Sequence, residues 1–89
     1  MTAGHIKPWS VCTDEERLDP SNGLALSPIY DKAFDAGYIT FDHLGRIQIS
    51  SLLVRDAEAL GISGNETIGA VTAEMERYLK FHREQRFRE

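Results

Sequence analysis

Four side chains in the first 35 residues could together support hydrolytic chemistry. His5 is followed by Asn22 seventeen positions later, and Asp31 and Asp35 lie nine and thirteen positions beyond Asn22. An imidazole can accept a proton near neutral pH, and two carboxylates four residues apart project from one face of a helix. Two like charges at that spacing weaken an isolated helix, which is a reason to look for a cation that both carboxylates bind.

Each of these residues, taken alone, has a commoner structural explanation. A single histidine on a strand is more often structural than catalytic. An asparagine that precedes a glycine, as Asn22 does, is more often a turn residue. The pair formed by Asp31 and Asp35 is more often a solvated helix face than a metal site. Only the arrangement of all four residues favours chemistry.

The surrounding pattern predicts two short strands and a helix that would position these side chains. Residues 3–7 predict a first strand, and the alternating residues 24–26 predict a second. The helix is expected to begin at Pro28, with the Ser27 side chain capping its first turn, and to end at Gly37.

The rest of the chain predicts a hairpin and further helices, so the fold class is α+β. Residues 38–41 and 46–50 alternate in the manner of paired strands. Their buried face would hold Ile39, Phe41, Ile47 and Ile49. Residues 51–60 predict a helix, and Thr72 is expected to cap a last amphipathic helix. We expect one domain over residues 1–89.

We expect the hairpin and the last helix to hold the hydrophobic core, because the strongest periodic patterns lie there. Residues 1–8 are expected to contribute much less to stability, although Trp9 is expected to pack over the core. Between these regions, residues 14–18 predict a single helical turn.

Composition excludes several classes of protein. The chain has 89 residues, 42% of them hydrophobic, and no apolar run approaches the ~18 residues that a membrane span needs. The N-terminus has no apolar signal region, and the single cysteine cannot form an internal disulfide. These features favour a cytoplasmic protein with no membrane partner.

The net charge of −4 argues against binding to nucleic acid through charge alone. Residues 73–89 differ, because they hold five basic and four acidic side chains. The commoner explanation is a solvated helix face, and contact with a phosphate backbone is the alternative.

The arrangement of His5, Asn22 and Asp31 resembles the HNH endonuclease family. The segments HIKPWS, TDEERLDPSNGL and LSPIYDKAFDAGYITFD are similar to the HNH domain of predicted bacterial restriction endonucleases, and so are GRIQIS and YLKFHRE. The resemblance runs from His5 to Phe87 and implies an apparently N-terminally truncated domain. His5 would then lie on an unpaired end of the chain.

The resemblance implies a ββα-metal core with a hairpin within residues 1–50 and a C-terminal helical extension over residues 51–89. It implies that His5 is the general base and that Asn22 fixes the strand and loop around it. Asp31 would occupy the metal-binding position, with Asp35 as a second ligand.

The resemblance also implies cofactor and partners. Two carboxylates with water suit Mg²⁺ or Mn²⁺, and the substrate would be DNA. Candidate contacts to nucleic acid are Lys7, Lys32, Arg83 and Arg86. A missing N-terminal domain or a homodimer partner could complete the enzyme. The alternative is a truncated, inactive remnant that binds DNA or protein.

Overall fold

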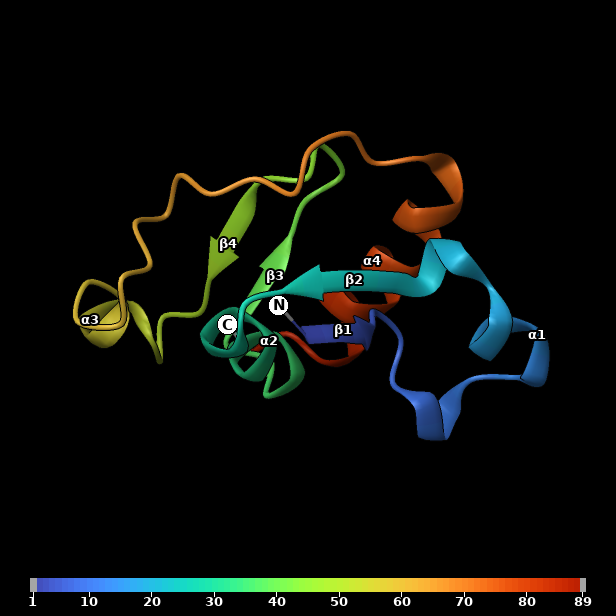
Figure 1. Cartoon of the computed structure of the whole chain (residues 1–89). Helices are drawn as coiled ribbons and strands as arrows, with labels where there is room; N and C mark the ends of the chain where they lie inside the picture. The colour runs from blue at the N-terminus through green and yellow to red at the C-terminus, as the bar shows by residue number, and fades with distance from the viewer. Residues whose placement is uncertain (1, 89) are drawn as a thin grey trace.

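The computed structural model describes residues 2–88 of the chain, shown in Figure 1. Its strands are β1 (Thr2–His5), β2 (Gly23–Leu26), β3 (Ile39–Phe41) and β4 (Ile47–Ile49). Its α-helices are α1 (Asp14–Leu18), α2 (Pro28–Asp35), α3 (Val54–Ala57) and α4 (Ala73–Gln85), and short 3-10 turns span Trp9–Val11 and Pro20–Asn22. The α+β class expected from the sequence is confirmed.

The first half of the chain forms a ββα unit. β1 pairs antiparallel with β2, and His5 lies opposite Gly23. α2 follows directly and packs against both strands, as Figure 1 shows. The expectation that His5 lies on an unpaired end is therefore wrong, because β2 supplies the hydrogen-bonding partner of that strand.

α2 begins and ends at the expected residues, but the expected side-chain cap is missing. Ser27 is the N-cap residue, yet its side chain makes no capping hydrogen bond, and Pro28 supplies the fixed φ angle of the first turn. Gly37 follows the helix with φ +83°. A Cβ atom at Gly37 would lie 2.0 Å from the carbonyl oxygen of Arg86, so only glycine permits the C-terminal segment to pack there.

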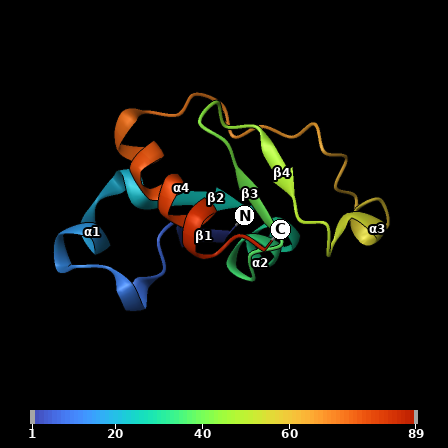
Figure 2. The same cartoon turned by 180° about the vertical axis from the view of Figure 1, so that it is seen from behind.

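β3 and β4 form the predicted hairpin. Ile39 pairs with Ile49 and Phe41 pairs with Ile47, which confirms that the four side chains share a face, on which Ile49 is half-buried. Thr40, on the opposite face, is also buried, because α4 covers that side of β3. Figure 2 shows α4 from the side on which it covers β3 and the turn before β2.

α4 confirms the prediction for the last helix. Its N-cap is Thr72, whose hydroxyl accepts a hydrogen bond from the Met75 backbone amide. Tyr78, Leu79 and His82 from this helix are buried in the core. The segment after residue 50 therefore builds the same core as the ββα unit.

The predicted helix over residues 51–60 is mostly absent. Only Val54–Ala57 is helical, and turns flank it on both sides. No side chain caps its N-terminus, and Leu52, Val54 and Leu60 remain exposed.

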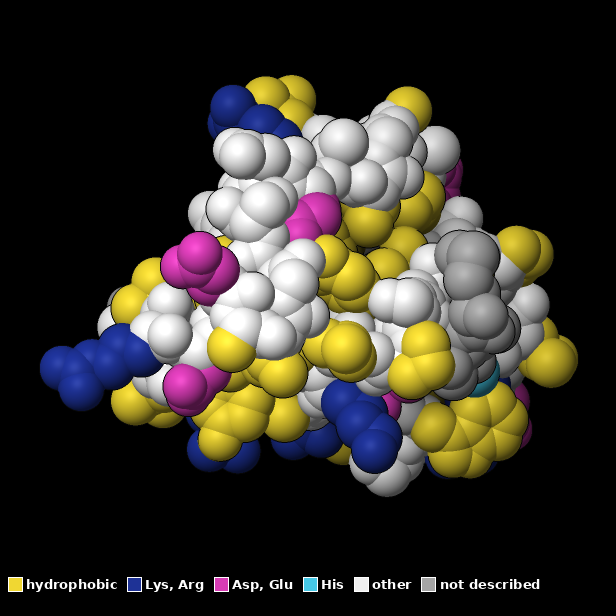
Figure 3. Space-filling view, turned by 60° about the vertical axis from the view of Figure 1, so that its left-hand side comes forward, with side chains coloured by type: hydrophobic (Ala, Val, Ile, Leu, Met, Phe, Trp, Pro, Cys, Tyr) yellow, Lys and Arg dark blue, Asp and Glu magenta, His cyan; other side chains and the backbone are white. Residues whose placement is uncertain are grey.

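The face seen in Figure 3 carries hydrophobic side chains across its middle with charged side chains around them.

Two expectations about the core are wrong. Ile6 is only 1% exposed and belongs to the main hydrophobic cluster, so the first eight residues contribute directly to the core. Trp9 is 54% exposed, because the 3-10 turn that follows Pro8 carries the indole to the surface. In the described part of the chain, no helix is both long enough and apolar enough to span a membrane.

Candidate functional site

A surface hollow lies where the end of β1, the end of α2 and the C-terminal segment meet. We call it the His5 hollow, and it is lined by Gly4, His5, Pro8, Trp9, Asp35 and Arg86. The last two residues of this set come from different elements: Asp35 ends α2, and Arg86 follows α4. The hollow therefore combines an imidazole, a carboxylate and a guanidinium.

The protonation of the His5 ring follows from its hydrogen bond. The Nε2 atom lies 3.0 Å from the backbone carbonyl oxygen of Arg17. Since a carbonyl oxygen only accepts hydrogen bonds, Nε2 must carry the hydrogen, and in the neutral ring Nδ1 then keeps its lone pair. His5 is half-buried, and its ring meets the Trp9 ring at 71° with centroids 5.1 Å apart. The neutral ring is thus oriented to accept a proton at Nδ1.

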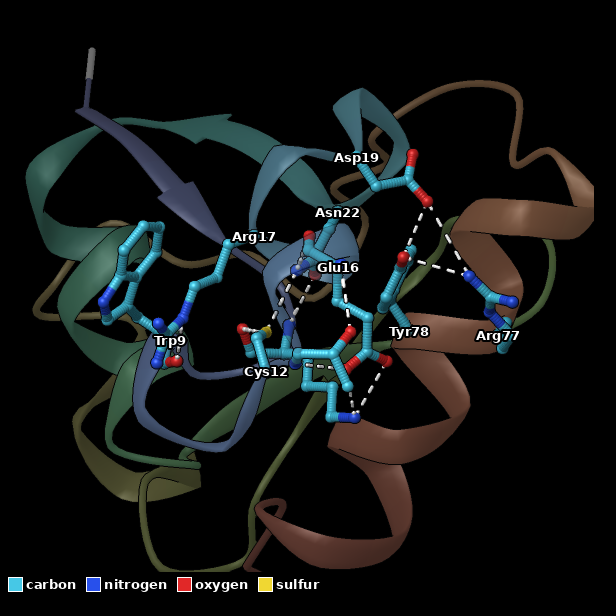
Figure 4. Close-up of polar contacts among 10 residues, drawn as sticks. Trp9, Cys12, Glu16, Arg17, Asp19, Asn22, Arg77 and Tyr78 are labelled. Carbon is cyan, nitrogen blue, oxygen red and sulfur yellow. Dashed lines mark hydrogen bonds and ion pairs between the residues drawn. The ribbon is translucent and has the colours of Figure 1, made fainter.

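Asn22 is completely buried, and its side chain joins two segments that follow His5 in the chain. Its Oδ1 atom accepts a hydrogen bond of 2.8 Å from the backbone amide of Lys7. Its Nδ2 atom donates to the carbonyl oxygen of Glu16 at 3.1 Å and lies 3.4 Å from the sulfur of Cys12. Figure 4 shows these contacts. The amide therefore joins the chain just after His5 to the loop that holds the Arg17 carbonyl.

Asp31 and Asp35 lie on the side of α2 that faces β1. A Cβ atom at Gly4 would lie 3.0 Å from Oδ1 of Asp31, so this carboxylate reaches the strand one residue before His5. Partial burial of the carboxyl and the negative charge of Asp31 raise the pKa of Asp35, while the charge of Arg86 opposes the shift.

The donor set around α2 fits a hard divalent cation bound by few protein ligands. No group of three or more His, Cys, Asp or Glu side chains that could hold a metal occurs within residues 2–88. Asp31 and Asp35 repel each other, and a cation between them would relieve that repulsion. Mg²⁺ commonly uses one or two carboxylates and keeps several water ligands, so two carboxylates suffice for it.

Two of the four predicted nucleic-acid contacts are paired with glutamates inside the protein. The Nζ atom of Lys7 donates to both carboxylate oxygens of Glu16 at 2.9 Å. Arg83 donates to the carboxylate of Glu76 at 3.0 Å and to the carbonyl oxygen of Phe41 at 2.9 Å. Their charges are thus largely engaged in holding the fold together.

The other two predicted contacts, Lys32 and Arg86, are exposed. Lys32 is exposed on α2, one residue after Asp31. Arg86 is exposed and lines the His5 hollow itself. Of the four predicted contacts, Arg86 is the one that lines the hollow.

Two features of the site could not be identified from the sequence. The Arg17 carbonyl that orients His5 is a backbone group, which leaves no signal in the residue types. The exposure of Trp9 was missed because an aromatic residue after a strand suggests burial. A readable signal was overlooked nearby: Thr13 and Glu16 form a capping box at the start of α1, which has the pattern of a polar N-cap followed by glutamate three residues later.

Comparison with known proteins agrees with this geometry. Residues 1–42 match a family model described as HNH endonuclease, and the match includes β1, β2 and α2 with all four candidate residues of the site. No curated protein gives a significant match to the chain. A nuclease domain implies nucleic acid as its substrate, with DNA as the substrate of this family, and the family generally uses a divalent metal. The ββα unit that builds the His5 hollow is thus the part of the chain that is similar to the HNH endonuclease model.

Proposed function

We propose that this chain is a divalent-metal-dependent DNA endonuclease of restriction type, with His5 as its general base. One observation carries the proposal. The Nε2 atom of His5 donates its hydrogen to the Arg17 carbonyl, so Nδ1 is the proton acceptor. The ring also lines the same hollow as Asp35 and Arg86.

Hydrolysis of a phosphodiester requires an activated water on one side of the phosphorus. In our proposal Nδ1 of His5 takes the proton of that water. The hydrogen bond from Nε2 to Arg17 keeps the ring oriented during the transfer and becomes stronger as the imidazole gains charge. Asn22 holds the two backbone segments that fix this geometry.

Asp31 and Asp35 would hold the metal, with Mg²⁺ or Mn²⁺ the best fit to their oxygen donors. When bound, such a cation polarises a phosphoryl oxygen and stabilises the departing 3′ oxygen. Arg86 and Lys32 would contact the phosphates on either side of the bond that is cut.

In this proposal the protein acts on DNA in the cytoplasm, and a second copy in a homodimer would contribute to DNA recognition. The alternative function is an inactive remnant of the family that binds DNA or protein. The ion pairs of Lys7 and Arg83, together with the net charge of −4, reduce the positive charge that DNA would meet, so they favour the protein-binding form of this alternative.

The decisive experiment is nicking of a supercoiled plasmid during a titration with Mg²⁺ or Mn²⁺. A general base contributes about 10²–10⁴-fold in rate, so His5→Ala should lose activity by that factor while DNA affinity changes little. His43→Ala is the matched control, because His43 is exposed in the turn between β3 and β4. Equal residual rates for wild type, His5→Ala and His43→Ala would rule out the nuclease and favour the remnant.

A further inference from the structure

Trp9 is a large aromatic side chain held open at the edge of the His5 hollow. It is 54% exposed, although a tryptophan that only fills space in a small protein would normally be covered. Its ring touches that of His5, with centroids 5.1 Å apart, and both residues line the same hollow as Arg86. The exposed indole is therefore next to the proposed point of hydrolysis.

The indole is held in position despite its exposure. The guanidinium of Arg17 lies 4.6 Å from the centre of the Trp9 ring, which is the geometry of a cation–π contact. The Nε atom of Arg17 also donates to the Trp9 carbonyl oxygen at 3.1 Å, and Asp14 pairs with the same guanidinium at 3.6 Å. Figure 4 shows Arg17 reaching Trp9 from α1. A ring fixed in this way loses little further freedom when a flat ligand packs against it.

We propose that Trp9 is a stacking platform for an unpaired nucleobase of the nucleotide next to the cleaved phosphate. The inference rests on the proposed nuclease function, because it assumes that a phosphate enters the hollow beside His5 and Arg86. Aromatic side chains bind exposed bases of any sequence through their π faces, and neighbouring cations attract the backbone.

The same geometry defines the form of DNA that the site prefers. In an intact duplex, each base lies between its neighbours and cannot place a face on a protein ring at the backbone. The base must be unpaired, or leave the stack, before it reaches Trp9. The platform therefore favours single-stranded, nicked or locally opened DNA over a continuous duplex.

The test uses the fact that Trp9 is the only tryptophan of the chain, so intrinsic indole fluorescence reports on this position alone. A single-stranded oligonucleotide and its duplex are titrated into the wild-type protein in EDTA, which separates binding from cleavage. Anisotropy of labelled DNA measures affinity independently. We expect the single strand to quench Trp9 fluorescence to saturation, and the duplex to quench it much less.

Three variants accompany the titration. Stacking of one base contributes on the order of 1–3 kcal/mol, so Trp9→Leu should weaken single-strand binding by about fivefold to a hundredfold and leave duplex binding unchanged. Trp9→Phe should restore most of the loss. The control is Leu44→Ala, which alters a similarly exposed apolar residue in the β3–β4 turn. Circular dichroism verifies that each variant is folded.

The outcomes separate this proposal from the nuclease proposal. DNA binding or cleavage without quenching, or equal effects of Trp9→Leu and Leu44→Ala, would overturn the platform and leave the nuclease intact. Quenching by single strands without cleavage in any metal would support the platform and count against the nuclease. No binding to either DNA would overturn the platform as well.

Discussion

The Oδ1 atom of Asn22 accepts a hydrogen bond of 2.8 Å from the backbone amide of Lys7, two residues after His5. The same side chain donates to the Glu16 carbonyl, one residue before the Arg17 carbonyl that orients the His5 ring. Asn22 therefore sets the distance between the histidine and the group that fixes its tautomer.

Asn22→Ala should reduce both stability and activity. Leaving the Lys7 amide without its partner should cost about 1–3 kcal/mol, whereas the Glu16 carbonyl keeps the hydrogen bond from the Asp19 amide at 3.3 Å. Urea unfolding measures this loss, and plasmid nicking under conditions where the variant is folded measures the effect on His5. Asn65→Ala, an exposed change in a loop, is the control and should leave both unchanged. Full activity in a folded Asn22→Ala protein would show that the amide does not position His5.

Mg²⁺ or Mn²⁺ should raise the melting temperature if Asp31 and Asp35 hold the metal. Binding to the folded state alone contributes about 2.7 kcal/mol when the metal is at a hundred times its Kd. The double variant Asp31→Asn, Asp35→Asn should abolish the shift, because both carboxylate charges are gone. Asp56→Asn changes an exposed aspartate on α3 and should keep it. Identical melting curves for wild type with and without metal would contradict the site.

Ile6, which directly follows β1, should matter to stability as much as the hairpin does. Phe41→Ala should cost about 3–5 kcal/mol and Ile6→Ala about 2–5 kcal/mol, because both side chains are almost completely buried. Leu44→Ala, at an exposed position, should stay within about 0.5 kcal/mol of wild type. The measurement is urea unfolding. An Ile6→Ala protein as stable as Leu44→Ala would show that the segment after β1 lies outside the cooperative core.

His82 should make the fold sensitive to mild acid. It is buried, its Nε2 atom donates to the Phe34 carbonyl at 2.8 Å, and its Nδ1 atom accepts from the Thr40 hydroxyl at 2.8 Å. Burial lowers its pKa to about 4; the hydrogen bond to Phe34 opposes the shift, and the charges of Arg86 and Arg83 add to it.

The sign of the effect follows from the proton count. Between an unfolded pKa of about 6.5 and the folded value of about 4, the unfolded chain binds more protons at His82, so stability falls as pH falls. This group alone should reduce the free energy of unfolding by about 2 kcal/mol between pH 7 and pH 5. Urea unfolding at both pH values measures the loss, which should be smaller in His82→Gln. An equal loss in both proteins would assign the acid sensitivity to other groups.

Local patterns predicted most of the fold. The hairpin and its shared face followed from the alternation of Ile39 and Phe41 with Ile47 and Ile49, and the cap at Thr72 followed from its position before an amphipathic run. These features depend on neighbours in the sequence, which is why they can be predicted from it.

The errors concern contacts between distant segments. Trp9 is exposed because the turn after Pro8 directs it outward, and Ile6 is buried in a cluster that also contains Phe34 of α2 and Phe41 of the hairpin. The bond between His5 and the Arg17 carbonyl depends on how the α1 loop folds back, which no residue type reveals. The positions of the candidate site residues were predictable from their spacing, but their surroundings were not.

The wall of the His5 hollow joins Gly4 to Arg86, residues separated by nearly the whole described chain. Arg86 reaches it because Arg88 donates its backbone amide to the Gly37 carbonyl at 2.8 Å, beside the end of α2. During synthesis the N-terminal residues emerge first, whereas contacts of this sequence separation form late in folding. A ribosome-bound chain that ends before residue 86 would carry the histidine and both aspartates without the guanidinium opposite them. Completion of the hollow is therefore coupled to completion of the fold.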